Sequence, residues 1–336
     1  MAKRHGQLFE QITSMENLRR AYEKARLGKA RMRNVQRFDR DVEGNLARIR
    51  QSLLDKSFTT SRYQVKKIFV PKERDIYVLP FAPDRIVQHA IMNVLEPICD
   101  AMFIHDSYAC RQGKGIHRGS LRTMEFVRRY RYVLKCDIAK FYPSIDHDVL
   151  YGIVRQKIKC PDTLRLLEDI IYSVPGGKNA PIGNFTSQWF CNLYLHELDR
   201  LVKHTYKIKG YLRYCDDFCL FHDDKTFLRE MKEIIREFLA TRLKLTFSRA
   251  ELFPVSQGVD FLGYRHFRSH ILLRKSTATR VRRRLAALPK LLATGKITAE
   301  QYRSSLSSTR GWLKWANTHN LAITLRLDAL EARCAA

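Results

Sequence analysis

Asp216 and Asp217 stand side by side in an otherwise apolar stretch, with Tyr211 and Leu212 before them and Phe218 after them. A fold can bury two adjacent carboxylates only if cations neutralise them, because taking an anion out of water is costly. Divalent metal ions are the usual partners, and hard carboxylate oxygens suit magnesium. An exposed Asp-Asp turn explains the pair equally well, since Asp is common in turns. The pair alone therefore leaves two interpretations open.

A second acidic position favours the metal site. The residues from Val133 to Cys136 predict a strand that ends at Asp137 and Ile138. A carboxylate at a strand end, beside a pair on a neighbouring hairpin, is typical of nucleotidyl transfer. In that chemistry, two metal ions activate the 3′ hydroxyl of a primer and stabilise the leaving pyrophosphate. Asp146 also lies nearby in the sequence, and we interpret it as the N-cap of the following helix.

The balance of charge indicates a polyanionic partner. The chain has 61 Lys and Arg residues against 34 Asp and Glu residues, a formal net charge of +27. The excess is spread along the chain, as a nucleic-acid path requires, although a generally basic surface or a ribosome-associated protein would also explain it. The eight cysteines include no CxxC pair, which argues against a zinc finger. No signal peptide or membrane span is expected, so we predict a reducing, cytoplasmic location and no membrane partner.

The pattern of apolar residues predicts an α+β fold. Residues 7–57 are expected to be helical with a break near Gly44, and residues 62–80 to form a hairpin with a basic tip. Asp84 is predicted to cap the next helix. Helices are expected again from Lys275 onward, where Trp312 and Trp315 are predicted core residues. The central part alternates strands (132–137, 211–220, 246–253, 259–266) with helices (146–158, 161–172, 187–206, 225–243), of which the helix over 187–206 is expected to be amphipathic.

Five motifs together resemble the reverse transcriptase family. Residues 214–217, Tyr-Cys-Asp-Asp, resemble its YxDD box, and residues 137–142 resemble its first metal-binding motif. Residues 84–90 and 108–115 resemble the fingers motifs of bacterial and group II intron-type enzymes. The motifs follow the family order within residues 65–265, whereas a lone YxDD box would carry little weight. The fifth motif resembles the primer grip and consists of Phe261, Leu262, Gly263 and Tyr264.

The resemblance implies a right-hand polymerase architecture with fingers, palm and thumb. Its parts would be a basic helical N-terminal extension (1–60), fingers (61–130), a palm of antiparallel sheet and helices (131–265) and a short helical thumb (266–336). Fingers and palm would be interleaved near 150–185. The implied activity is that of an RNA-directed DNA polymerase, which uses two Mg²⁺ ions and deoxynucleoside triphosphates. Its partners would be a structured template RNA and a cDNA/RNA duplex.

The resemblance also implies roles for individual residues. Asp137, Asp216 and Asp217 would be catalytic and, with the Ile138 carbonyl, would hold the metal ions. Tyr142 would exclude a 2′ hydroxyl, although it could instead be a core aromatic. A general acid for pyrophosphate would be Lys244 or Arg249, which the sequence does not separate. Further nucleotide contacts would come from a basic hairpin tip and from two central segments. The tip, which could also be merely solvated, would contribute Lys72 and Arg74. The central segments would contribute Phe141, Ile182, Gly183, Asn184 and Gln188.

The segment from Pro181 to Gln188 indicates a subfamily. Most reverse transcriptases have Gln just before its glycine, where this chain has Ile182. Ile-Gly-Asn-x-x-Ser-Gln resembles the signature of diversity-generating retroelement (DGR) enzymes of phages and bacteria. That resemblance implies error-prone, adenine-mutagenic cDNA synthesis from a template-repeat RNA for diversification of a target gene (mutagenic retrohoming), with a small, basic, oligomeric accessory protein as partner. The alternatives are a retron-type or abortive-infection reverse transcriptase, or a catalytically idle RNA-binding factor that kept the fold.

Overall fold

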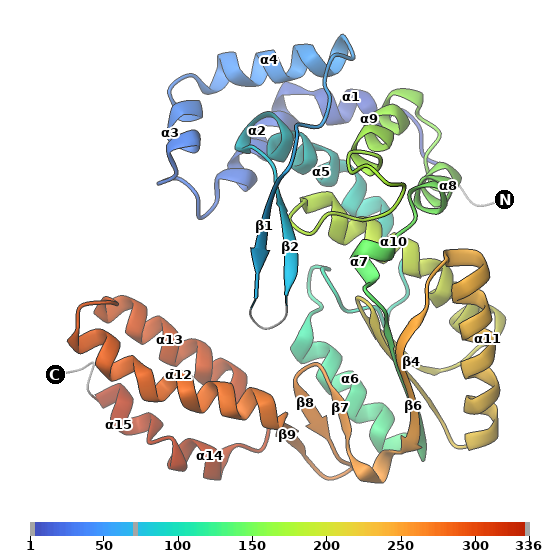
Figure 1. Cartoon of the computed structure of the whole chain (residues 1–336), viewed down its shortest axis with the longest axis vertical. Coiled ribbons are helices and arrows are strands. Elements are labelled where there is room, and N and C mark those ends of the chain that lie inside the picture. Colours follow the sequence, from blue (N-terminus) through green and yellow to red (C-terminus); the bar gives the residue numbers. More distant parts are fainter. Residues whose placement is uncertain (1–3, 70–72, 333–336) are drawn as a thin grey trace.

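The computed structural model describes residues 4–69 and 73–332. Four parts follow one another along the chain (Figure 1): N-terminal helices, a two-stranded hairpin, a central sheet with its helices, and C-terminal helices beside a small second sheet. The chain therefore has a mixed helix-and-sheet fold, as its apolar pattern predicts. Among the described helices, none is long and apolar enough to cross a lipid bilayer.

The N-terminal part consists of the helices α1 (Phe9–Thr13), α2 (Met15–Arg26), α3 (Arg33–Asp39) and α4 (Val42–Leu54). Helices α1 and α2 pack on α5 (Ile86–Asp100), and α4 packs on α2. The expected break near Gly44 is wrong. Gly44 lies in the first turn of α4, where its N–H donates to the side chain of Asp41 (2.9 Å), so the chain turns before this helix and not within it.

Strands β1 (Gln64–Ile68) and β2 (Arg74–Val78) form the predicted hairpin. Lys72, at its predicted basic tip, lies outside the described residues. A π-helical turn, η1 (Phe81–Arg85), leads from the hairpin directly into α5, so Asp84 is not the N-cap that the sequence predicts. The buried Asp84 carboxylate instead accepts hydrogen bonds from the backbone N–H and the hydroxyl of Ser61 (2.8 and 2.7 Å), which ties the base of the hairpin to the helix.

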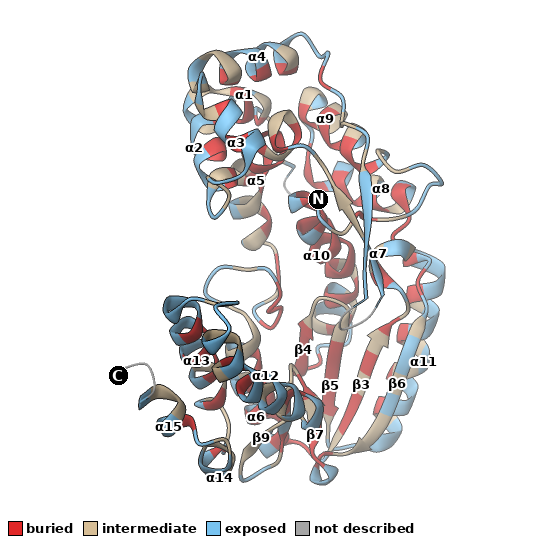
Figure 2. Cartoon of the chain, turned by 60° about the vertical axis from the view of Figure 1, so that its left-hand side comes forward, coloured by how far each residue is buried: buried red, intermediate tan, exposed pale blue. Residues whose placement is uncertain are grey.

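The central sheet is antiparallel, with strand order β4-β5-β3-β6. Its strands are β3 (Tyr132–Ile138), β4 (Gly210–Tyr214), β5 (Asp217–His222) and β6 (Phe247–Pro254). Helix α11 (Lys225–Leu243) packs on β5, β3 and β6, whereas α6 (Ile116–Arg129) packs beside the edge strand β4. Figure 2 shows β4 and β5 buried along most of their length, while β6 and the outer side of α11 face solvent.

Along the chain, β3 is followed by three helices and then by the longer helix α10 (Phe185–Arg200). The three helices are α7 (Phe141–Ser144), α8 (His147–Lys157) and α9 (Pro161–Ile171). Asp146 is the N-cap of α8, as predicted, and accepts a hydrogen bond from the Val149 N–H (3.1 Å). The prediction of an amphipathic helix over 187–206 is wrong. Helix α10 starts at Phe185 and is buried on almost every side, because α5, α8 and α11 pack around it; it ends in the π-helical turn η2 (Leu201–Thr205).

A second antiparallel sheet follows the short turn η3 (Val255–Gln257) and contains β7 (Val259–Phe261), β8 (Tyr264–His266) and β9 (Ile271–Leu273). The strand predicted over 259–266 is thus a hairpin. Its turn residues Leu262 and Gly263 both have positive φ (55° and 84°), as a tight type I′ turn requires. Helices α12 (Lys275–Ala293), α13 (Ala299–Leu313), α14 (His319–Thr324) and α15 (Leu327–Ala332) then surround a core of their own.

Candidate active site

The three predicted acids meet at one end of the central sheet. Asp137 lies near the end of β3, and Asp217 begins β5, which pairs directly with β3. Tyr214 pairs with Asp217, so Cys215 and Asp216 form a two-residue turn between β4 and β5. Cys215 has a φ of 56°, the left-handed backbone that such a turn demands. The turn and the strand pairing therefore bring together carboxylates that are about 80 residues apart in the sequence.

Negative charge is in excess at this point. Burial, followed by the negative charge of Asp137, raises the pKa of Asp216 above its usual range. Burial and the charges of Asp137 and Asp216 raise the pKa of Asp217 further, and Asp217 shares a hydrogen bond with Asp137. Lys135 beside Asp217 and Arg74 toward Asp216 oppose these shifts without cancelling them. The site is thus built to attract additional positive charge.

The donor set fits magnesium as an open site and not as a closed cage. Within the described residues, no three His, Cys, Asp or Glu side chains already have the arrangement of a metal site. Mg²⁺ commonly takes only one or two protein carboxylates and completes its shell with water and substrate phosphates. Asp137 and Asp216, with Asp217 beside them, supply hard oxygens of that kind. Ser248, which the sequence did not single out, donates its hydroxyl to the Asp137 carboxylate and also to the Asp137 carbonyl (3.2 Å).

A buried ion pair that the sequence did not reveal supports the acidic turn. The side chains of Arg213 on β4 and Asp199 on α10 are both fully buried, and Arg213 donates to both carboxylate oxygens (2.8 and 2.6 Å). Arg213 Nη1 also donates to the carbonyl of Cys215 (3.1 Å), inside the turn. An arginine within an otherwise apolar strand is the only signal in the sequence that could have indicated this pair.

Two aromatic residues follow Asp137, and the structure places them differently. Phe141 is buried in the core, whereas Tyr142 is half-buried and lies against the acidic turn. The Cys215 thiol donates to the Tyr142 hydroxyl oxygen (3.8 Å), and burial raises the pKa of Tyr142 well above its usual range. Tyr142 is therefore a neutral aromatic at the edge of the site, and the buried ring of Phe141 packs edge-to-face against it (5.8 Å between centroids).

The segment from Pro181 to Gln188 is attached to the β1–β2 hairpin. The Tyr77 N–H donates to the Ile182 carbonyl (2.7 Å). Gly183 has a φ of 127°, and a Cβ there would collide with the Tyr77 carbonyl oxygen, so the glycine permits this contact. Buried Asn184 donates to the Tyr63 hydroxyl (2.6 Å), whereas Gln188 is exposed beside a small cavity. These contacts join the predicted nucleotide segment to the hairpin that carries Arg74.

The two candidate general acids have different surroundings. Lys244 Nζ pairs with Asp146 (2.8 Å), the N-cap of α8, and this contact raises the pKa of Lys244. Arg249 lies directly opposite Asp137 in the β3–β6 pairing, on the same face of the sheet, with a long contact to Glu251 (3.8 Å). The fold therefore brings Arg249 nearer to the acids, while Lys244 already has a carboxylate partner.

The predicted primer-grip residues form the β7–β8 hairpin and its turn. Phe261 and Tyr264 are buried, and Tyr264 stacks on Trp312 (5.4 Å between centroids) and donates to the Trp312 carbonyl (3.2 Å). Trp315 stacks on His117 of α6 (4.8 Å). The two tryptophans, predicted as core residues, are half-buried and join the C-terminal helices to the rest of the chain.

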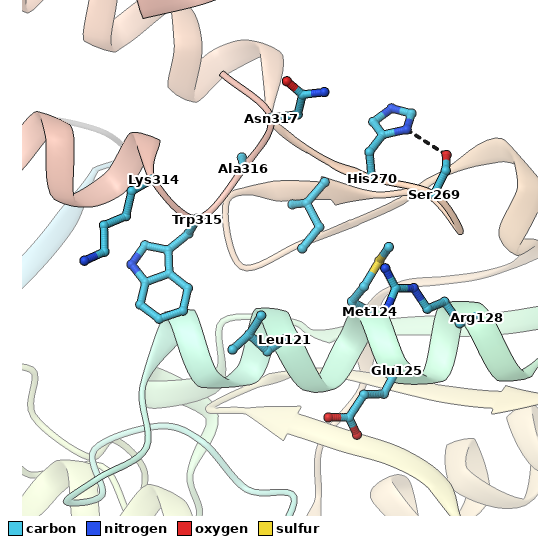
Figure 3. Close-up of a pocket in the computed structure, with 11 residues that line it drawn as sticks. Leu121, Met124, Glu125, Arg128, Ser269, His270, Lys314, Trp315, Ala316 and Asn317 are labelled. Carbon is cyan, nitrogen blue, oxygen red and sulfur yellow. Dashed lines mark hydrogen bonds between the residues drawn. The ribbon is translucent and has the colours of Figure 1, made fainter. Parts of the chain in front are cut away.

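A cavity of about 510 Å³ lies at this joint and not at the acids (Figure 3). Trp315 points from the C-terminal helices toward Leu121 of α6, and His270 lies across the opening. None of the three acids lines this cavity. The acids are instead partly buried at the end of the central sheet, with Arg74 of the hairpin close enough to act on Asp216.

A carboxylate pair on a hairpin turn, beside a third carboxylate on the adjacent strand, is typical of enzymes that transfer nucleotidyl groups. The profile of the family described as reverse transcriptase (RNA-dependent DNA polymerase) matches residues 70–266, more than half of the chain. The chain belongs to this family and contains a reverse transcriptase domain.

Relatives of known name are distant and share only part of their length with this chain. Protein YkfC of Escherichia coli (strain K12) is 23% identical over 254 residues, which cover 60% of this chain and 66% of YkfC. The group II intron-encoded protein LtrA of Lactococcus lactis subsp. cremoris is 26% identical over 178 residues, 48% of this chain and 28% of LtrA. Apo telomerase from Candida tropicalis has a TM-score of 0.46 and 12% identity, over 66% of this chain and 50% of that chain.

Proposed function

We propose that the chain is an RNA-directed DNA polymerase with Asp137, Asp216 and Asp217 as its catalytic carboxylates. The observation that carries the proposal is the meeting of these acids at the β4–β5 turn with too few cations to neutralise them. Membership of the reverse transcriptase family and the similarity to a group II intron-encoded protein support the same activity. The net charge of +27 suits a template RNA and a cDNA/RNA duplex as partners.

The chain's own residues would hold and orient the reactants. When bound, two Mg²⁺ ions would activate the primer hydroxyl and stabilise the charge on the leaving pyrophosphate. Asp137, Asp216 and the Ile138 carbonyl would hold these ions, with Asp217 beside them. Arg74 would direct its positive charge to the triphosphate of the incoming nucleotide. Arg249, opposite Asp137, would add positive charge beside the leaving pyrophosphate, whereas Lys244 would be the general acid, because a guanidinium does not give up a proton.

These positions support the right-hand assignment, which is part of the proposal. The β1–β2 hairpin would belong to the fingers (61–130), since it carries Arg74 and contacts the Ile182 segment, and the helices before it would form the basic N-terminal extension (1–60). The central sheet would be the palm, and α12 to α15 the thumb, attached through the β7–β8 hairpin as primer grip. Tyr142, at the edge of the acidic turn, would lie under the sugar and exclude a 2′ hydroxyl.

We further propose that the enzyme is of the DGR type and acts in the cytoplasm of bacterial cells. Support comes from Ile182, because its apolar side chain would contact the nascent base pair but has no donor or acceptor for a hydrogen bond with it. The product would be adenine-mutagenic cDNA copied from a template-repeat RNA, with a small basic accessory protein as partner. Sequencing that cDNA tests the subfamily: mutations concentrated at template adenines are expected, and uniformly accurate copying would instead favour a retron-type or abortive-infection enzyme.

Primer extension on an RNA template with magnesium tests the activity itself. Asp216→Asn and Asp137→Asn should each lower the rate about 1,000-fold or more, equal to about 4 kcal/mol of transition-state stabilisation. RNA affinity should stay near that of the wild type. Asp162→Asn, at a half-buried acid of α9 paired with Lys56, is the matched control and should extend normally. Near-normal extension by Asp216→Asn would refute the assignment, and an inactive wild type would indicate an idle RNA-binding factor.

A further inference from the structure

A second strongly basic site lies at the other end of β4 from the acidic turn. A cavity of about 350 Å³ opens there between α6, η2 and the start of β4. Strand β4 has five residues, so at a rise of about 3.3 Å per residue its first and last residues are about 13 Å apart. None of the residues assigned to catalysis lines this cavity. Its lining is Arg122, Glu125, Phe126, Arg129, Lys203 and Lys209.

A buried carboxylate holds two of these cations in place. Asp106 accepts hydrogen bonds from Arg122 Nε (2.9 Å) and Lys203 Nζ (3.2 Å), and its side chain is 5% exposed. Burial alone would raise the pKa of Asp106, but Arg122 and Lys203 hold that pKa below its usual range. Lys203 also donates to the Lys209 carbonyl (2.9 Å), which fixes the start of β4. The cavity floor is therefore preorganised and ionised.

The other two cations at the cavity, Arg129 and Lys209, are available for a ligand. The guanidinium of Arg122 lies over the ring of Phe126 (4.4 Å), and that of Arg129 lies over Tyr130 (5.5 Å). Both Arg129 and Lys209 are exposed, and within residues 4–69 and 73–332 neither has an ion-pair partner. Asp106 and Glu125 cannot neutralise four cations, so a net positive charge remains for an anion.

We propose that this cavity binds the phosphodiester backbone of the RNA at a point away from the acidic turn. Two stacked guanidinium groups with two lysines beside them suit phosphate oxygens, which accept hydrogen bonds from several donors at once. An RNA bound both here and at the acidic turn would contact the protein near both ends of β4. The RNA as partner rests on the proposed function, whereas the anion site itself rests only on the contacts described above.

The salt dependence of RNA binding tests the proposal. In Arg129→Gln/Lys209→Gln, the affinity of the full chain for a long structured RNA should depend less on salt. The slope of log K against log salt should fall by about 1.4 to 1.8, because each lost phosphate contact removes about 0.7–0.9. Arg122 and Lys203 are left unchanged, since they hold the buried Asp106. The matched control is Arg229→Gln/Arg242→Gln, which removes the same charge from exposed positions on α11 and should change the slope by less than half as much.

Two further measurements separate this site from the catalytic one. A primer–template too short to reach from the acidic turn to the basic cavity measures the catalytic site alone. Single-nucleotide addition to it should be unchanged in Arg129→Gln/Lys209→Gln. Equal slopes for the two double variants, or loss of that addition, would overturn the proposal. Protection against thermal unfolding by inorganic pyrophosphate in the wild type alone, without a change in slope, would show a small-anion site and would also overturn it. An inactive polymerase would still leave the slopes interpretable.

Discussion

Replacing Asp199 with Ala should destabilise the central sheet and impair the turn that carries Asp216. Asp199 and Arg213 are fully buried together, and the Tyr211 hydroxyl donates to the same carboxylate (2.7 Å). Removing the carboxylate leaves the Arg213 guanidinium buried without a counter-charge. Among the residues that the structure describes, the remaining acceptors for this guanidinium are the side-chain oxygen of Asn192 (3.2 Å) and the carbonyl of Cys215 (3.1 Å).

The expected loss of stability is large. Removing one partner of a buried pair costs about 3–5 kcal/mol. The lost hydrogen bond from Tyr211 adds about 0.5–1.5 kcal/mol. The sum, about 3.5–6.5 kcal/mol, is comparable to the whole free energy of unfolding of many domains, about 5–15 kcal/mol. Because Arg213 also holds the Cys215 carbonyl, nucleotide addition should fall by more than the unfolded fraction explains.

Urea unfolding followed by circular dichroism measures the first effect, and primer extension at low urea measures the second. Glu233→Ala removes one partner of an exposed pair with Arg236 and should leave the urea midpoint nearly unchanged, since exposed pairs contribute little. Asp199→Leu/Arg213→Met should recover much of the stability that Asp199→Ala loses, because it leaves no unpaired charge. A wild-type midpoint in Asp199→Ala, or a double variant as unstable as the single one, would refute the reasoning.

Three further predictions concern the nucleotide site and the response to pH. Tyr142→Ala should incorporate ribonucleotides more readily, measured as the ratio of deoxy- to ribonucleotide addition; an unchanged ratio would place the steric gate elsewhere. Ile182→Gln should reduce misincorporation by about two- to twelvefold, the value of one hydrogen bond, in cDNA sequenced from one RNA template; an unchanged error spectrum would remove the role of Ile182. Burial lowers the pKa of three histidines to about 4: His89, His196 and His266. The unfolded chain therefore binds their protons first, and the free energy of unfolding should fall as the pH drops from about 6.5 to about 4. The expected slope is up to about 1.4 kcal/mol per pH unit for each histidine. Urea unfolding at a series of pH values measures this effect, in the variant Asp216→Asn/Asp217→Asn. The two acids are removed because their raised pKa values change stability with pH in the opposite direction. A free energy of unfolding that does not change with pH in this variant would contradict the prediction.

Local patterns were sufficient for several elements. Helix α11 spans Lys225–Leu243, as its periodicity predicts, and Asp146 caps α8, because a side chain and an N–H three residues away decide a cap. The acids Asp137, Asp216 and Asp217 could also be found from sequence, since charged residues within apolar strands are conspicuous. In each case the interactions responsible lie within a few residues of one another.

Other features depend on contacts between distant segments, and no local pattern carries them. Helix α10 looked amphipathic, but helices packed around it bury its polar positions as well. Gly183 was expected among the nucleotide contacts, but no local pattern indicated that its missing Cβ also makes room for the Tyr77 carbonyl, 106 residues away in the chain. The partner of Arg213 was likewise set by the packing of α10 against β4. Side-chain chemistry restricts which groups can be buried, but only the tertiary fold decides which groups meet, because burial and pairing energies depend on neighbours from elsewhere in the chain.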